Sequence, residues 1–150
     1  VREMLDAGIN IGLGVDGSAS NDSGHMLNEA RQAMLLQRVM KTGDALTARQ
    51  SLAVATRGGA AVLGRNDIGQ LAPGFAADIA AFDCRGIDFA GAAWDLLAGL
   101  LFCGSSKASY TIINGKIIVD QGQILTMDMP KLLENHHAMT ADLMRKAQWA

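Results

Sequence analysis

The sequence predicts an α/β fold, and three patterns along the chain support this prediction. Apolar residues alternate from Ile9 to Val15 with the period of a β-strand, and Asp16 follows directly. From His25 to Met40 apolar residues recur at the spacing of an amphipathic helix, with Glu29 and Arg38 expected on its outer face. Asn114-Gly115 joins two short apolar runs, which is the strongest short-range signal of a hairpin with a type I′ turn. We therefore expect a strand, then helices, then a β-rich portion.

Shorter signals place the other helices of the first half. The residues before Gly8 are typical of the last turns of a helix, with Gly8 at its C-cap. Thr47 and Gln50 have the spacing of a capping box and predict a helix start. We expect Gly58-Gly59 to interrupt that helix and a third short helix to cover Ala60 to Leu63.

In the second half, Ala77 to Phe82 is predicted to be a strand, closed by Asp83. Trp94 to Phe102 is predicted to be helical. Gln121-Gly122 predicts a turn into a further short strand at Ile124-Leu125. Pro130 begins a last helix, which we expect to reach about Gln148.

Composition narrows the function classes. The chain has 150 residues, of which 49% are hydrophobic, enough for a core. A net charge of -2 with no cluster of basic residues argues against a nucleic-acid surface. The longest apolar stretch, near Leu96 to Cys103, is too short to span a bilayer. Two cysteines form no disulfide framework, so we expect a cytoplasmic protein.

Asp16 is the main candidate for chemistry, because acids at the carboxyl ends of buried strands carry it in many α/β enzymes. An aspartate can bind a divalent metal ion through one oxygen and accept a proton with the other. From spacing alone, a plain Asx-turn cap is the simpler interpretation. In the loop that follows, Ser20 and Asn21 are candidates for contacts to substrate or to groups around the metal, or they satisfy only their own backbone.

Three segments resemble one known family. They are I-N-I-G-L-G-V-D-G-S-A-S-N-D (9–22), D-I-G-Q-L-A-P-G-F-A-A-D-I-A-A-F-D (67–83) and Y-T-I-I-N-G-K-I-I-V-D-Q-G (110–122). They are similar to the amidohydrolase superfamily, in its branch of guanine, 8-oxoguanine and triazine aminohydrolases. The resemblance implies that Asp16 ends the eighth strand of a (β/α)8 barrel, holds a divalent metal ion, most simply zinc, and takes part in catalysis.

The resemblance also implies a division of the chain. Residues 1–66 would form the end of the barrel, 67–126 part of a small β-sandwich with an inserted helix, and 127–150 a C-terminal helix. A parallel barrel needs about 250 residues, so we expect the C-terminal piece of a larger enzyme. The family's other metal ligands, a His-x-His pair and further histidines, have no counterpart here, and its catalytic glutamate is also missing. We therefore expect the fragment alone to be inactive.

The expected function of the complete protein is hydrolytic deamination of an amino-substituted N-heterocycle, with 8-oxoguanine or a related purine preferred. A triazine chlorohydrolase or aminohydrolase is the alternative within the family. Gly12, Gly14 and Gly17 spell a dinucleotide-binding pattern, but they lie in the predicted strand rather than after it, so a nucleotide-binding oxidoreductase segment is weakly supported. A non-catalytic β-sandwich module is the third class. The expected partner is a small heterocycle, and a homo-oligomer is left open.

The remaining conspicuous side chains have simpler interpretations. His25 is expected at a helix cap or on the surface, and the adjacent His136 and His137 point to different faces of a helix. Trp94 and Trp149 are expected to be packing anchors.

Overall fold

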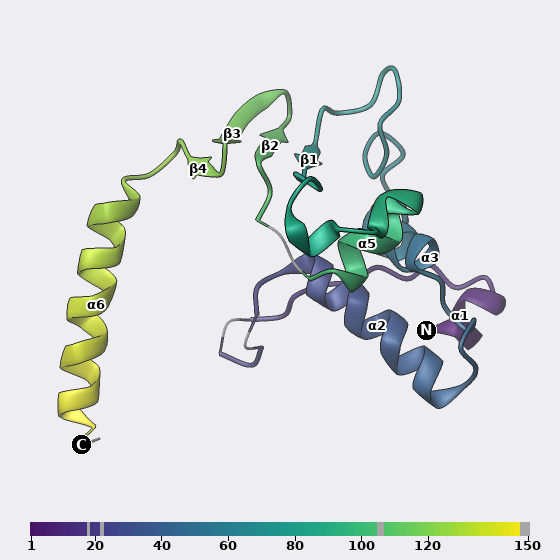
Figure 1. Cartoon of the computed structure of the whole chain (residues 1–150), viewed down its shortest axis with the longest axis horizontal. Coiled ribbons are helices and arrows are strands. Elements are labelled where there is room, and N and C mark those ends of the chain that lie inside the picture. The colour runs from purple at the N-terminus through teal and green to yellow at the C-terminus, as the bar shows by residue number, and fades with distance from the viewer. Residues whose placement is uncertain (18, 22, 105–106, 148–150) are drawn as a thin grey trace.

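The computed structural model describes residues 1–17, 19–21, 23–104 and 107–147. These residues form a helical body, a small antiparallel sheet and a long helix that stands apart from both (Figure 1). The predictions that concern Ser18, Asp22, Gln148 and Trp149 lie outside the described residues.

The helical body contains the following elements, given in chain order. They are α1 (Arg2–Asp6), α2 (Met26–Met40), α3 (Ala48–Ala53), the π-helix η1 (Val54–Gly58), α4 (Gly59–Val62), the 3₁₀ turns η2 (Ile87–Phe89) and η3 (Ala92–Trp94), and α5 (Leu96–Phe102). The predicted capping box of α3 is confirmed. Gln50 N donates to Thr47 Oγ1 at 3.2 Å, and Thr47 N donates to Gln50 Oε1 at 2.9 Å. Gly8 ends α1 with a φ of +71°, one position after the C-cap residue Ala7, so the predicted helix end is confirmed to within one residue.

The core lies between α2, α3 and α5. Its fully or nearly buried members are Ala30, Met34, Leu46, Ala48 and Leu101. Ser51 on α3 is also fully buried, and its hydroxyl donates to the carbonyl oxygen of Ala30 on α2. A buried hydroxyl needs such a partner, so this bond fixes α3 against α2.

The predicted strand from Ile9 to Val15 is wrong as a strand of this chain. The segment has no regular secondary structure, because a parallel barrel strand exists only through hydrogen bonds to neighbouring strands, and the described residues supply none for it. The segment instead lies against the helix that contains Gly58. A Cβ at Gly58 would collide with the carbonyl oxygen of Ile11, and a Cβ at Gly12 would lie 3.0 Å from Gly59 Cα.

The predicted interruption at Gly58-Gly59 is also wrong. Both residues have helical backbone angles, and the helix runs on from α3 through the π-helical turn η1 into α4. The third helix, expected at Ala60 to Leu63, is confirmed in position, although it starts at Gly59. Gly58 has its place because of the close approach of Ile11, and not because the helix ends there.

The sheet has the order β1-β2-β3-β4, with every pair antiparallel. Its strands are β1 (Ile79–Ala81), β2 (Tyr110–Ile113), β3 (Lys116–Asp120) and β4 (Gln123–Ile124). The type I′ hairpin is confirmed, since Asn114 and Gly115 have φ of +48° and +77°. Gln121 and Gly122 repeat the pattern with +48° and +78°, which confirms the second turn.

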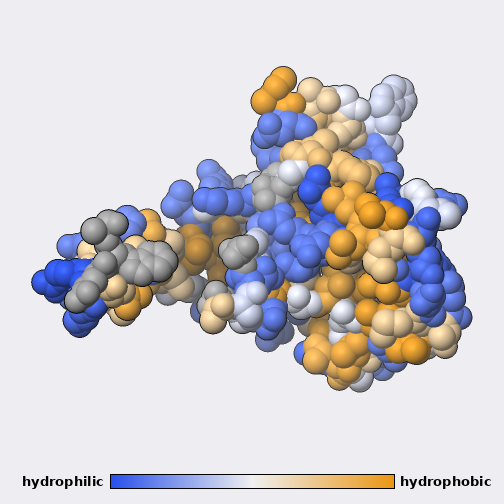
Figure 2. Space-filling view, turned by 90° about the horizontal axis from the view of Figure 1, so that it is seen from below, coloured by the Kyte–Doolittle hydropathy of each residue, from blue (hydrophilic) through white to orange (hydrophobic). Residues whose placement is uncertain are grey.

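Helix α6 (Met129–Lys146) begins with the side chain of Asp128 capping Lys131 N at 3.0 Å and with Pro130 in its first turn. Figure 1 shows that it projects from the body, and none of its residues is buried. Figure 2 shows apolar side chains on the outer surface of the body and on α6. No helix in the described ranges is long and apolar enough to cross a membrane.

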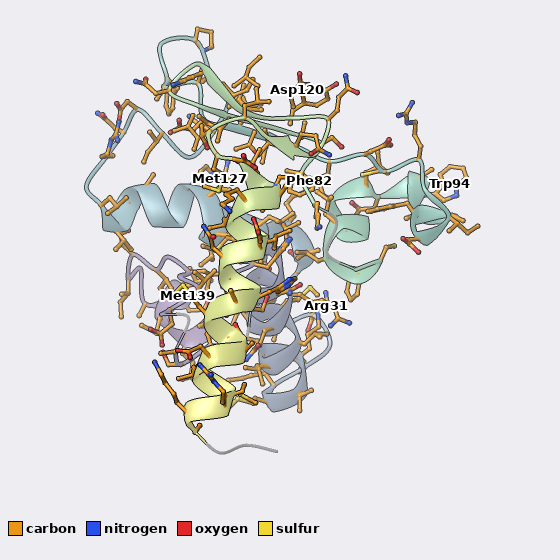
Figure 3. The ribbon with its side chains drawn as sticks, turned by 90° about the vertical axis from the view of Figure 1, so that its left-hand side faces the viewer. Arg31, Phe82, Trp94, Asp120, Met127 and Met139 are labelled. Atoms are coloured by element: carbon orange, nitrogen blue, oxygen red, sulfur yellow. The ribbon has the colours of Figure 1, made fainter. Side chains whose placement is uncertain are left out.

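Trp94 is not a packing anchor among the described residues. It is 97% exposed and points away from the body (Figure 3). It lies in η3, at the start of the predicted helix, which is divided into η3 and α5. Asp95 separates the two, and its side chain caps Ala98 N at 3.0 Å.

Candidate active site

Asp16 has an uncommon backbone conformation. Its φ is +60°, in the left-handed region. The other non-glycine residues with positive φ in the described part of the chain, Asn114 and Gln121, lie in hairpin turns that require it. For an L-residue this conformation costs about 1–2 kcal/mol, although Asp tolerates it better than most. Such residues cluster at functional sites.

The Asp16 side chain is exposed, and one of its oxygens is only locally engaged. Gly17 N, in the next residue along the chain, donates to Oδ1 at 2.7 Å. Within the described residues no cation pairs with Asp16, and no donor reaches Oδ2. The carboxylate can therefore accept a metal ion or a proton at Oδ2.

The turn after Asp16 satisfies part of its own backbone. Ser20 N and Asn21 N both donate to the Gly17 carbonyl oxygen, at 2.9 and 3.0 Å. The Ser20 hydroxyl donates to the same oxygen at 3.2 Å while its side chain stays exposed. These bonds tie Ser20 and Asn21 to Gly17, next to Asp16, and they leave the Ser20 oxygen able to accept a further hydrogen bond.

Asn21 connects the end of the Ile9–Val15 segment to helix α2. Its Nδ2 donates to the carbonyl oxygen of Val15 at 2.6 Å and to Glu29 Oε1 at 2.9 Å. Its Oδ1 accepts from Ser23 N at 3.3 Å. Glu29 was expected to lie outside on α2, but it is half-buried in this network. The signal that could have found it is an acid in the first turn of a helix that follows a polar loop.

The histidines of the described residues do not assemble a metal site. His25 is the N-cap residue of α2, as expected, yet its side chain makes no capping bond, and its buried Nδ1 has no partner among the described residues. His136 and His137 are exposed on α6, as predicted, with ring centroids 6.3 Å apart. No group of three His, Cys, Asp or Glu residues in the described ranges could hold a metal ion. Asp16 could therefore supply one ligand to a divalent ion, and the other ligands would have to come from outside the described residues.

The fold around Asp16 also weakens the dinucleotide-binding interpretation. That fingerprint needs a glycine-rich turn between a strand and the N-terminus of a helix. Here Gly12 packs against Gly59, and α2 begins only at Met26. Asp16 instead lies in a polar segment between residues 9–15 and α2, and the antiparallel sheet follows later in the chain.

The sequence comparisons name the class. The amidohydrolase family pattern matches residues 1–118, and the chain belongs to this family. The chain is 43% identical over 141 residues to the 8-oxoguanine deaminase of Pseudomonas aeruginosa. It is 42% identical over 136 residues to a 5-methylthioadenosine/S-adenosylhomocysteine deaminase of Pelotomaculum thermopropionicum. These matches cover 94% and 89% of this chain but 31% of each relative, so the chain spans about a third of their length.

Solved structures agree with this assignment. Atrazine chlorohydrolase of Arthrobacter aurescens, complexed with zinc, superposes with a TM-score of 0.84 at 41% identity, over 91% of this chain and 31% of that one. An adenosine deaminase of Xanthomonas campestris with bound zinc gives a TM-score of 0.87 at 30% identity, over 97% and 33%. The predicted family is confirmed, and the oxidoreductase and free-standing sandwich interpretations are set aside.

Proposed function

We propose that this chain is the carboxyl-terminal part of a longer, metal-dependent amidohydrolase that removes ammonia from an amino-substituted N-heterocycle. Such an enzyme hydrolyses a carbon–nitrogen bond outside a peptide. We propose 8-oxoguanine, or a related purine, as its substrate. The observation that carries this proposal is the 43% identity to an 8-oxoguanine deaminase over 94% of the chain. The deaminase relatives and the zinc-containing structural neighbours support the reaction type and zinc as the metal.

In this proposal Asp16 is one ligand of the metal and the group that moves the proton. A bound divalent ion would lower the pKa of water and so supply hydroxide near neutral pH. Water adds to the ring carbon that carries the amine, the carbon–nitrogen bond breaks, and ammonia leaves. The Asp16 carboxylate accepts a proton from the water and delivers it to the leaving nitrogen. The exposed carboxylate, with Oδ2 open in the described residues, supports this role.

The loop after Asp16 supports the site in two ways. We propose that Ser20 meets the substrate or a group near the metal, since its exposed hydroxyl lies on the loop fixed to Gly17. Asn21 belongs to the surroundings of Asp16, because its amide is already engaged with Val15 and Glu29. We further propose the division into barrel (1–66), sandwich (67–126) and C-terminal helix (127–150) for the complete enzyme. The antiparallel sheet would be one part of the sandwich.

The test is a substrate panel with the full-length, zinc-loaded enzyme that contains this chain. Ammonia release is measured with 8-oxoguanine, 5-methylthioadenosine and S-adenosylhomocysteine, and chloride release is measured with atrazine. We expect the highest kcat/KM with 8-oxoguanine. Turnover of none of these compounds would contradict the proposal, and zinc content measured on the same preparation ensures that the enzyme was loaded.

A triazine is the second candidate substrate. The 41% identity and TM-score of 0.84 to the atrazine chlorohydrolase favour it nearly as strongly as the deaminase identity favours a purine. Chloride release from atrazine at a higher kcat/KM than ammonia release from 8-oxoguanine would select this alternative. The reaction class, hydrolytic displacement on an N-heterocycle, would be the same.

A further inference from the structure

A continuous chain of contacts joins the buried core to Asp16. Ala30 and Met34 of α2 are fully buried, which fixes this helix in the body. Glu29 directly precedes Ala30, and its Oε1 accepts from Asn21 Nδ2 at 2.9 Å. The same Nδ2 donates to the carbonyl oxygen of Val15 at 2.6 Å. This carbonyl belongs to the peptide unit that enters Asp16, so the core reaches the backbone of Asp16 in three steps.

The two hydrogen bonds that the Asn21 amide donates depend on each other. A primary amide has two N–H donors, and the Asn21 amide directs one to each partner. The carboxylate of Glu29 fixes the rotation of this amide through a charge-assisted bond, which is stronger than a bond between neutral groups. Without that bond the amide could turn away from Val15. A second contact, from Asn28 Nδ2 to Ser23 Oγ at 3.0 Å, ties the same loop to α2.

This hydrogen-bond network can hold the uncommon backbone conformation of Asp16. Its φ of +60° is unfavourable for an isolated L-residue, so neighbouring contacts must hold it. The Val15–Asp16 peptide plane sets this angle, and Asn21 holds the carbonyl of that plane. Rotating the plane would swing the Asp16 carboxylate, and catalysis is sensitive to displacements of about 1 Å.

We propose that Glu29 is a positioning residue that acts through Asn21 on the backbone of Asp16, keeping the carboxylate aimed at the metal and the leaving group. This inference rests on the proposed function of Asp16. Glu29 itself touches neither substrate nor metal. Removing an outer partner of this kind costs about 10- to 100-fold in activity or metal affinity.

The test compares Glu29→Ala with Glu29→Gln in the full-length enzyme. Glu29→Ala removes the acceptor, and we expect kcat to fall about 10- to 100-fold with KM nearly unchanged, together with weaker zinc binding in a chelator competition. Glu29→Gln keeps an oxygen that can accept from Asn21, so it should retain kcat within about threefold. Asn21→Ala should lower kcat as much as Glu29→Ala does. The double variant should lower kcat no further, because both substitutions remove the same hydrogen-bond network.

Two controls separate positioning from stability. Gln32→Ala changes an exposed residue one turn along α2 and should leave kcat and zinc affinity unchanged. Glu29 also lies in the first turn of α2, where a negative charge stabilises the helix. If that were its only role, Glu29→Ala and Glu29→Gln would lower the unfolding temperature and kcat alike. Such equal losses would overturn the proposal.

Other results distinguish this inference from the proposed function. If Asp16→Asn abolishes turnover while Glu29→Ala and Asn21→Ala keep wild-type kcat and zinc affinity, the inference alone is wrong. If Asn21→Ala raises KM at unchanged kcat, Asn21 contacts the substrate directly, and the inference is again wrong. If Asp16→Asn is itself fully active, the proposed function has failed first.

Discussion

Two aspartates of this chain occupy comparable places and have opposite surroundings. Asp16 follows the Ile9–Val15 segment, and Asp83 follows β1 after one intervening residue. Both side chains are exposed. Arg85 binds both oxygens of Asp83, with Nε to Oδ1 at 2.9 Å and a terminal guanidinium nitrogen to Oδ2 at 2.7 Å, and Arg85 N adds a third bond. Asp16 has no such cation in the described part of the chain.

The two carboxylates differ in how many of their oxygens already have a partner in the described residues. The side-chain hydrogen bonds from Arg85, followed by its backbone N–H, lower the pKa of Asp83 from 3.8 to about 2. Asp83 lines an open cleft of about 520 Å³ with Arg85, Tyr110 and Gln121, yet its charge is already balanced. Asp16 keeps an oxygen without a partner in the described residues and a φ that the loop must hold. A carboxylate that is paired with a cation stabilises local structure, whereas a carboxylate without such a partner in a constrained loop is suited to binding a ligand.

The largest expected effect separates the two acids directly. In the full-length enzyme, Asp16→Asn removes the charge and the proton acceptor while keeping the shape, and turnover should fall at least about 100-fold. Metal content should fall as well, because an amide is a poorer ligand for a divalent ion. Asp83→Asn is the matched control and should keep kcat within about twofold, as expected for an exposed residue away from the chemistry. Steady-state kinetics of the two variants gives the comparison. Equal losses in both would remove the distinction.

The next effect concerns how the Ile9–Val15 segment is held. Gly58→Ala places a Cβ against the carbonyl oxygen of Ile11 and should destabilise the enzyme by about 1–3 kcal/mol, the usual cost of overpacking. Gly59→Ala is the neighbouring control. It has helical angles and open space at its Cβ, so it should be neutral or stabilise by about 0.5–1 kcal/mol. Thermal or denaturant unfolding measures both. A harmless Gly58→Ala would show that the segment is not packed as described.

The smallest expected effect concerns the ion pair between Asp83 and Arg85. Arg85→Gln removes the guanidinium, and the pKa of Asp83 should rise from about 2 toward 3.8. With Arg85 present, the stabilisation from this pair exists above pH 3.8 and is lost as the pH falls toward about 2, because the folded state favours the ionised form. Both side chains are substantially exposed, so the effect on stability is screened. NMR titration of labelled aspartate carboxyl carbons measures the pKa, and an unchanged value would contradict the pairing.

The sequence predicted those parts of the fold that depend on local signals. The capping box at Thr47, the helix end near Gly8 and the turn at Asn114-Gly115 need only neighbouring residues, and all three are confirmed. The strand from Ile9 to Val15 depends on partner strands, and the described part of the chain supplies none for it. Gly58 was misjudged because its contact with Ile11 joins residues far apart in sequence.

The candidate site was predicted to a similar extent. The choice of Asp16 rested on pattern and resemblance, and the loop geometry now supports it as a proposal. Glu29 was missed because periodicity placed it on the outer face of α2, while the loop folds back to meet it through Asn21. Trp94 was expected to pack, but no part of the described chain covers it. Side-chain partners that cross between elements are what local patterns cannot give.

The most direct measurement of the central claim is the position of the metal. A crystal of the full-length, zinc-loaded enzyme is measured on both sides of the zinc absorption edge, and the anomalous difference map locates the ion. We predict one strong peak about 2.0–2.2 Å from an oxygen of Asp16, the usual zinc–carboxylate distance. A zinc peak that Asp16 does not contact would contradict the account, as would an active enzyme with no zinc peak.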